Sequence, residues 1–201
     1  VWQGYTDGMT MPAGDLTLTA LWTPNTYKVT FNANGGVSGT ADKDVTYDST
    51  YGELPTPTKT GYDFAGWFTA KEDGTEVTAE TKVAITDAQT LYAHWTAKTF
   101  TVTFDPDGGS ACRSLTVIYD KPYGSLPTPT KTGFVFAGWY DGETRIFGNE
   151  TYTKTEGSEL KAHWTNNTFH IIYVVDGAIL QNISDPRIGG DELTNLYSYS
   201  K

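Results

Sequence analysis

The eight-residue phrase LPTPTKTG occurs twice in this chain of 201 residues, at 54–61 and at 126–133. The surrounding segments repeat as well: TYKVTFNANGG at 26–36 returns as TFTVTFDPDGG at 99–109, FAGW at 64–67 returns at 136–139, and LYAHW at 91–95 returns as LKAHW at 160–164. A period of this length indicates two copies of one small folding unit. The offset between the copies falls from 73 to 72 and then to 69 residues, and such short deletions mark surface loops.

The flanking segments belong to the same series. LTLTALW at 16–22 aligns with QTLYAHW at 89–95, and TNNTFHIIYVVDG at 165–177 aligns with TAKTFTVTFDPDG at 96–108. We therefore predict four segments along the chain. These are the C-terminal part of a preceding repeat at 1–24, complete repeats at 25–97 and 98–166, and the start of a further, divergent repeat at 167–201.

Each repeat has the pattern of short strands separated by turns. In YKVTF, Tyr27, Val29 and Phe31 alternate with polar residues, which is typical of a half-buried strand. NANGG and DPDGG supply residues that accept positive φ and so favour a hairpin turn. The prolines of LPTPTKTG lack amide donors and favour extended backbone, so this phrase is predicted to be a crossover whose final glycine admits the next strand. A bend is expected at Gly66, and the predicted fold is mainly β.

Aromatic residues are expected to form the core of each repeat. A unit of about 70 residues is near the lower limit for an independent core. Each buried ring contributes about 4 to 6 kcal/mol at about 25 cal/mol per Å². The predicted core residues are Phe31, Leu54, Phe64, Trp67, Leu91 and Trp95 in the first repeat, and Phe104, Leu126, Phe136, Trp139, Leu160 and Trp164 in the second.

The order VTFxxxGG, YGxLPTPTKTGYxFAGW and LYAHW resembles the Listeria/Bacteroides repeat family, the B-repeats of internalin-type surface proteins. The resemblance covers 26–95 and 99–164, whereas residues 165–201 depart from the pattern. It implies tandem ubiquitin-like β-grasp modules in an elongated array. It also implies an extracellular protein held at a bacterial cell surface or cell wall, with a role as a stalk or adhesion segment. The family offers no catalytic residues.

Charge and composition exclude several classes of partner and site. The net charge of -10 repels phosphate backbones, so nucleic acid is not an expected partner. No apolar run approaches the length of a membrane-spanning helix. Cys112 is the single cysteine, which rules out a disulfide within the chain and a cysteine-rich zinc site. We expect no cofactor and interpret Cys112 as a free surface thiol.

Two recurring features carry chemistry in other proteins, and both favour a structural interpretation here. His94 and His163 occupy the same place in the two repeats, but the third copy of this strand has Leu21, so we predict surface histidines rather than a catalytic or metal site. DPDGG resembles the start of a calcium loop with Asp105 and Asp107 as ligands. The twelfth position is Thr116 instead of a bidentate glutamate, which favours a hairpin turn.

The leading functional hypothesis is a non-enzymatic stalk, adhesion segment or surface fibre component, in which neighbouring repeats of the chain contact one another. The short linker at 96–98 predicts an elongated molecule. The alternative is a module that binds glycan or a host or neighbouring-cell surface protein through exposed Tyr47, Tyr51, Tyr119 and Tyr123. An enzyme is not expected, since no triad, carboxylate pair or metal cluster recurs in the repeats.

Overall fold

The computed structural model describes residue 14 and residues 19–167, 169–175 and 178–185. All regular secondary structure in these residues is β-strand, and none of them is helical. The prediction of a mainly β fold is confirmed. Nothing in the described part of the chain is a helix long and apolar enough to cross a membrane.

The first module is a five-stranded mixed sheet in the order β2-β1-β5-β3-β4. Strands β1 and β5 are parallel, and the other neighbours are antiparallel. The register of β3 on β5 shifts between Phe64 and Gly66, where the bend was predicted. The strands are β1 (Thr26–Asn32), β2 (Asp42–Thr46), β3 (Tyr62–Phe68), β4 (Glu76–Val77) and β5 (Gln89–Ala97).

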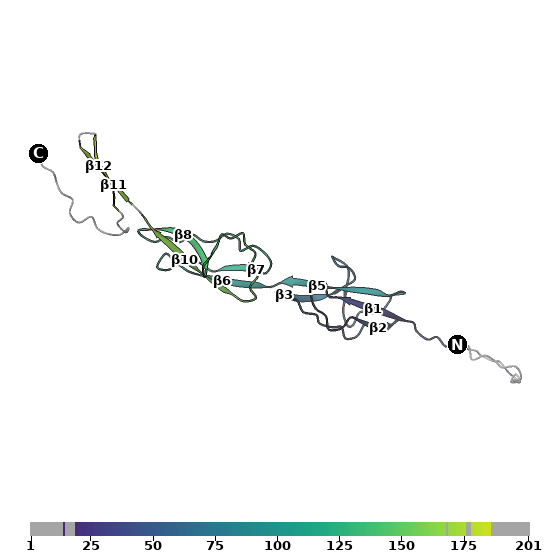
Figure 1. Cartoon of the computed structure of the whole chain (residues 1–201). Coiled ribbons are helices and arrows are strands. Elements are labelled where there is room, and N and C mark those ends of the chain that lie inside the picture. Colours follow the sequence, from purple (N-terminus) through teal and green to yellow (C-terminus); the bar gives the residue numbers. More distant parts are fainter. Residues whose placement is uncertain (1–13, 15–18, 168, 176–177, 186–201) are drawn as a thin grey trace.

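The second module repeats this topology in the order β7-β6-β10-β8-β9, with β6 and β10 parallel. Its strands are β6 (Thr99–Asp105), β7 (Leu115–Ile118), β8 (Phe134–Asp141), β9 (Thr144–Ile146) and β10 (Ser158–Asn166). An antiparallel hairpin of β11 (Phe169–Val175) and β12 (Ala178–Asp185) follows. Figure 1 shows the two sheets end to end along one axis.

The β-grasp assignment and the boundaries of the four predicted segments stay predictions. The hairpin of β11 and β12 stands where a third repeat would place its first two strands. Most of the predicted segment 1–24, and residues 186–201 of the last one, lie outside the described residues.

Each module has one aromatic core on the covered face of its sheet. Trp67 and Trp139 are 2% and 1% exposed, and both stand against two phenylalanine rings. The other predicted core residues fall into two groups. Phe31, Leu91, Phe104 and Leu160 are buried, and Leu54, Phe64, Trp95, Leu126, Phe136 and Trp164 pack half-buried against the clusters.

Irregular segments cover the core face and contribute residues that the strand pattern does not indicate. Tyr51 and Val83 of the first module are buried in the same cluster as the strand residues. Tyr123 and Tyr152 take the corresponding places in the second module. Their rings meet edge to face at 5.1 Å, so aromatic packing extends beyond the sheet.

The two LPTPTKTG phrases are irregular crossovers fixed by tryptophan. The indole Nε1–H of Trp67 donates to the carbonyl oxygen of Pro55 at 2.8 Å, and Trp139 donates to Pro127 at 2.7 Å. Because proline has no amide hydrogen, the carbonyl is the group by which this backbone can be held. The phrase therefore lies across the core, as predicted.

A carboxylate in the second module closes the turn after β9. Glu150 accepts hydrogen bonds from the backbone N–H groups of Phe147 at 3.0 Å and Gly148 at 2.9 Å. In the first module the hydroxyl of Thr81 takes this place and accepts from the N–H of Thr78 at 2.8 Å. Partial burial raises the pKa of Glu150, but the backbone donors outweigh it, and the net pKa lies below the usual glutamate value.

We predict that Glu150→Gln lowers the thermal midpoint of the second module at about pH 7 more than at about pH 3. The depressed pKa means that ionised Glu150 stabilises the fold above the usual glutamate pKa, and this contribution is lost as the pH falls through the lower folded value. Calorimetry at both pH values measures the difference. Glu143→Gln in the exposed β8–β9 turn is the control, and an equal loss at both pH values for Glu150→Gln would contradict the assignment.

Candidate functional site

The linker between the two modules is one residue long. Lys98 stands alone between β5 and β6. Its N–H donates to the carbonyl of Gly61 in the first module at 2.9 Å, and its carbonyl accepts from the N–H of Tyr119 in the second module at 2.8 Å. The linker is thus shorter than the predicted 96–98, because Thr96 and Ala97 belong to β5. Rotation about Lys98 would break a hydrogen bond to one module or the other.

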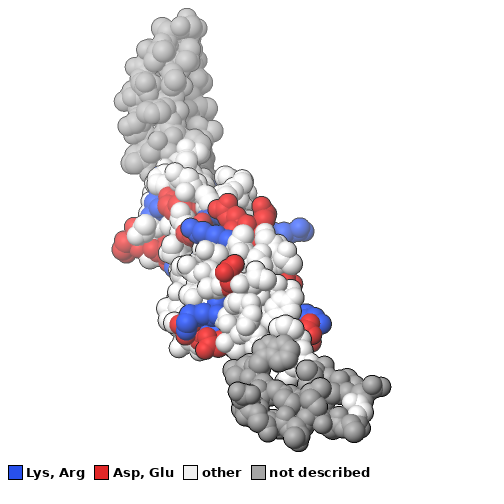
Figure 2. All heavy atoms as spheres, turned by 90° about the vertical axis from the view of Figure 1, so that its right-hand side faces the viewer, with Lys and Arg blue, Asp and Glu red and all other residues white. Residues whose placement is uncertain are grey.

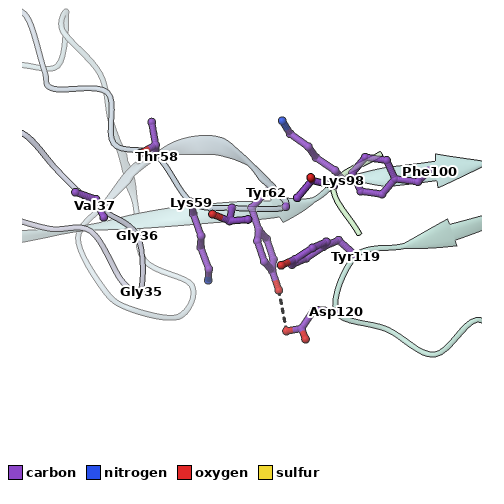
Figure 3. A pocket seen from close by; sticks show the side chains of 13 residues that line it. Gly35, Gly36, Val37, Thr58, Lys59, Tyr62, Lys98, Phe100, Tyr119 and Asp120 are labelled. Atoms are coloured by element: carbon purple, nitrogen blue, oxygen red, sulfur yellow. Dashed lines mark hydrogen bonds between the residues drawn. The ribbon is translucent and has the colours of Figure 1, made fainter. Parts of the chain in front are cut away.

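Two tyrosine side chains close the junction from the side. The rings of Tyr62 and Tyr119 meet edge to face with centroids 5.6 Å apart. The hydroxyl of Tyr62 donates to a carboxylate oxygen of Asp120 at 3.1 Å, which Figure 3 shows together with the two rings. Side-chain contact therefore supplements the backbone bonds of Lys98.

Gly61, the last residue of the first LPTPTKTG, lies directly beneath the Tyr119 ring. A Cβ atom added here would stand well under 3.0 Å from the ring carbons, and the backbone has φ of +76°. Both facts require glycine. The sequence assigned this glycine to strand entry alone, and the structure gives it a second role in the close approach of the modules.

An open groove of about 640 Å³ follows the junction and is lined from both modules. Lys59 lies over the Tyr62 ring with Nζ 4.3 Å from the centroid. Lys98 pairs with Asp63 at 3.4 Å. Both lysines in this groove therefore have partners within the protein. Within the described residues no group of three or more His, Cys, Asp or Glu could hold a metal ion.

The Tyr62 hydroxyl should make a small, pH-dependent contribution to the junction. Partial burial, followed by the hydrogen bond and the charge of Asp120, raises the pKa of Tyr62. A raised folded pKa means that the contribution is complete below the usual tyrosine pKa and is lost as the pH rises through the folded value.

We predict that Tyr62→Phe loosens the junction by about 1 kcal/mol or less, since the bond is exposed to solvent. The distance distribution between spin labels on the two modules measures this at about pH 8 and about pH 11. The distance distribution of the parent protein should be broader at the higher pH. That of Tyr62→Phe should already be slightly broad at the lower pH and should change less. Tyr92→Phe, on β5 of the first module, is the matched control. Equal alkaline broadening in all three proteins would rule out this contribution.

The repeated histidines each stack on a cross-strand ring at the sheet surface. His94 lies parallel to Phe68, and His163 to Tyr140, with ring centroids 3.9 Å apart in both pairs. His94 is half-buried and also contacts the carbonyl of Ala70 at 3.0 Å, whereas His163 is exposed. These contacts give the recurring histidine a packing role.

The DPDGG segment is a turn held by its own side chains. Asp105 accepts a hydrogen bond from the N–H of Asp107 at 3.0 Å, and Asp107 has φ of +48°. Lys161 lies 3.3 Å from the Asp107 carboxylate. The same turn forms in the first module, where Asn32 accepts from the N–H of Asn34 at 2.9 Å. The acidic residues are therefore turn formers.

Cys112 is less accessible than a surface thiol. It is a free cysteine, half-buried against the core of the second module. Burial raises its pKa, which reduces the fraction of reactive thiolate.

The expectation of four exposed tyrosines is wrong for two of them. Tyr51 and Tyr123 are core residues, only 4% and 7% exposed. Tyr119 is half-buried at the junction, and Tyr47 remains 43% exposed. The sequence missed this because the irregular segments that carry Tyr51 and Tyr123 lack strand periodicity, and only the fold shows that they cover the core.

Charged side chains are distributed rather than gathered. On the face drawn in Figure 2, lysine and arginine lie close to aspartate and glutamate, and neither charge forms a patch of its own. Exposed ion pairs such as Lys28 with Asp42 at 3.3 Å and Lys82 with Asp48 at 2.6 Å contribute to this pattern. Mixed charge of this kind favours solubility over electrostatic capture of a ligand.

Comparison with known proteins identifies relatives of the two modules. The family model of the Listeria-Bacteroides repeat domain matches residues 27–94 and 100–165. A protein described as a membrane protein from Evansella cellulosilytica is 34% identical over 164 residues, which is 81% of this chain and 24% of that protein. Internalin H of Listeria monocytogenes is 40% identical over 92 residues, 46% of this chain and 16% of internalin H. The chain thus spans a quarter or less of the length of these relatives.

Proposed function

Because this chain belongs to the Listeria-Bacteroides repeat domain family, we propose that it is a stiff, non-enzymatic spacer in a bacterial cell-surface protein. The names of its relatives, a membrane protein and an internalin, support a surface location. The structural observation that carries the proposal is the junction at Lys98, whose backbone is hydrogen-bonded to a different module on each side.

A stiff junction matters for a spacer because a flexible chain is a poor one. The end-to-end distance of a flexible linker grows only with the square root of its length. Modules fixed end to end add their full lengths, so each repeat would move a distal binding domain farther from the cell. In this proposal the chain acts as a stalk that presents an adhesive part of the same protein.

The interior of the modules is also consistent with a spacer. Neither the covered sheet faces nor the junction groove offers an enclosed cavity with unpartnered polar groups, as far as the chain is described. Within the same residues no polar or charged side chain is buried. The apolar interior of the described residues supports a structural role over catalysis.

Small-angle X-ray scattering of the whole chain tests the proposal. We expect a pair-distance distribution with an early maximum and a long tail, as for a rod about two modules long. A symmetric distribution typical of a compact particle would overturn the stalk. Release of the repeats by protease treatment of intact producing cells tests the surface location, and resistance of the repeats on intact cells would contradict it.

Binding of glycan or of a host protein is the alternative proposal. Its support is weaker than expected, since two of the four tyrosines assigned to it lie in the cores. The uncovered sheet face, with its stacked aromatic and histidine rings in both modules, is the remaining surface suited to sugar stacking. A glycan array probed with the whole chain tests this, and the absence of any signal would count against glycan.

A further inference from the structure

The second module contacts the first through a small surface at the junction. The first module has an equivalent surface, which is open to solvent. Tyr119 and Asp120 receive the first module, next to Lys98. The corresponding residues of the first module are Tyr47, Asp48 and Asn25. We call these three residues the Tyr47 face.

The backbone of the Tyr47 face already has the geometry of the occupied junction. Tyr47 donates its N–H to the carbonyl of Asn25 at 2.9 Å, as Tyr119 does to Lys98 at 2.8 Å. The N–H of Asp48 donates to Val83 at 2.9 Å, and that of Asp120 donates to the corresponding Tyr152 at 2.9 Å. The receiving half of a junction is therefore preformed.

Exposure distinguishes the two surfaces. Tyr119 is half-buried, and Gly61 lies against its ring. Tyr47 is 43% exposed and is among the large side chains of the described chain that remain open to solvent. The equivalent tyrosines thus differ in surroundings: Gly61 covers the Tyr119 ring, whereas the Tyr47 ring is open to solvent on a backbone of the same geometry.

The surface that fits against the Tyr47 face is the turn at the end of LPTPTKTG, which we call the donor half of a junction. The chain contains two examples of it. Gly61 and Gly133 both have positive φ, and each precedes an aromatic residue. Lys59 lies over Tyr62, and Lys131 lies over Phe134 with Nζ 4.7 Å from the centroid. Gly133 also accepts the N–H of Asn167 at 3.1 Å, as Gly61 accepts that of Lys98.

The two donor halves do not share the hydroxyl group of Tyr62, because Phe134 stands at the equivalent position in the second. Asp48 correspondingly has a partner of its own, since Lys82 lies 2.6 Å from its carboxylate. The partner is therefore defined by a glycine that permits close approach and an aromatic ring beside it, either tyrosine or phenylalanine.

We propose that the Tyr47 face is the docking surface for the glycine–aromatic turn of another repeat of this family joined in front of it. The inference rests on the proposed stalk and deepens it, because it assigns the first module a rigid contact with a neighbour on that side. The contact is small, so it forms between repeats of one chain, where the effective concentration is in the millimolar range, and not between separate chains.

The sequence before the Tyr47 face is compatible with this junction. Asn25 stands at the place of Lys98, and its N–H would donate to the glycine carbonyl of the docked repeat as the N–H of Lys98 donates to Gly61. Pro24 stands at the place of Ala97. Successive amides of a strand point to opposite sides, so the amide that proline lacks points away from the strand that carries the glycine.

A third repeat completed on the whole chain tests the proposal. A copy of residues 26–73 is placed ahead of Val1, so that residues 1–24 supply the rest of that repeat. Trp22, now 87% exposed, takes the place of Trp95. A shift of its indole N–H signal in the amide NMR spectrum, assigned with Trp22→Phe, reports that the added repeat has folded. A second version uses a copy of residues 99–142, which presents Phe134 in place of Tyr62.

Spin labels at equivalent positions give the decisive distances. In a Cys112→Ser background, labels at Asp44 and Thr116 span the known junction, and labels at the added copy of Asp44 and at Asp44 itself span the new one. We expect the same narrow distance across both junctions. Tyr47→Ala should broaden only the new distance, and Tyr119→Ala only the known one.

The failure of this inference is distinguishable from failure of the stalk. A broad new distance beside a narrow known one, with Trp22 buried, would overturn the docking surface. A new distance that is narrow but unchanged by Tyr47→Ala would overturn it as well. A broad distance across the known junction would instead overturn the stalk.

Discussion

Trp67→Ala is expected to unfold the first module while the second module keeps its fold. The side chain is 2% exposed and packs between Phe31 and Phe64 at centroid distances of 4.9 and 5.6 Å. Truncation of a buried tryptophan costs about 3 to 5 kcal/mol. The carbonyl of Pro55 also loses its indole donor, which adds about 1 to 3 kcal/mol if the carbonyl stays buried.

That loss is comparable to the whole stability of a small module, which lies near the lower end of about 5 to 15 kcal/mol. Two-dimensional amide NMR spectra measure the outcome, since the signals of 26–97 should collapse and those of 99–166 should stay dispersed. Trp139→Ala is the matched variant and should give the reverse pattern. Phe147→Ala, at a position 66% exposed, should leave both sets in place. Collapse of both modules in Trp67→Ala would mean that they fold as one cooperative unit.

Gly61→Ala is expected to separate the two modules without unfolding either of them. The added methyl group would meet the ring of Tyr119 at well under 3.0 Å, and the positive φ adds about 1 to 2 kcal/mol of backbone strain. The protein relieves the clash by moving Tyr119 away, which breaks the contact with Tyr62 and strains the bonds of Lys98. The distance between spin labels at Asp44 and Thr116 should change from one narrow population to a broad distribution.

The control for this variant is Gly124→Ala. Gly124 has φ of +88°, but a Cβ atom there meets nothing within 4 Å. It therefore carries the backbone strain without the clash. We expect Gly124→Ala to lower the midpoint of the second module slightly and to leave the distance narrow. Equal broadening in both variants would show that backbone strain, and not the approach of Tyr119, controls the junction.

The sequence alone indicated the repeated module, its strands and the two tryptophans, Trp67 and Trp139, that are buried in its cores. Alternation in YKVTF, the Asn-Gly and Asp-Gly turns and the repeated tryptophans are local signals, because strand periodicity and turn chemistry depend on neighbouring residues. Repetition strengthened each signal, since a position such as Trp67 that returns as Trp139 is a structural position in both copies. The resemblance to the repeat family rested on the same residues and is confirmed.

The sequence also failed at identifiable places. Tyr51 and Tyr123 were assigned to the surface as aromatic rings for ligand stacking, although a small core uses the same residues for packing, and the fold places both in the cores. Cys112 likewise packs against the second core. In each case the side chain lies on an irregular segment, where no periodicity relates position in sequence to position relative to the sheet.

One signal for the junction was present in the sequence. The strand pattern of LYAHW continues almost without a break into TFTVTF, which leaves no room for a flexible linker. That spacing predicted an elongated molecule, but it gave no reason to connect Gly61 with Tyr119, which are 58 residues apart in sequence.

The LPTPTKTG phrase is repeated because the module is repeated, and its amino acids already indicate prolines for an extended crossover and a glycine for entry into the next strand. The second role of Gly61, as the point where the next module makes contact, is visible only in the folded protein. The physical reason is that turn and strand preferences act over a few residues. The fit between a glycine and a tyrosine ring exists only after both modules have folded and Lys98 has set their distance.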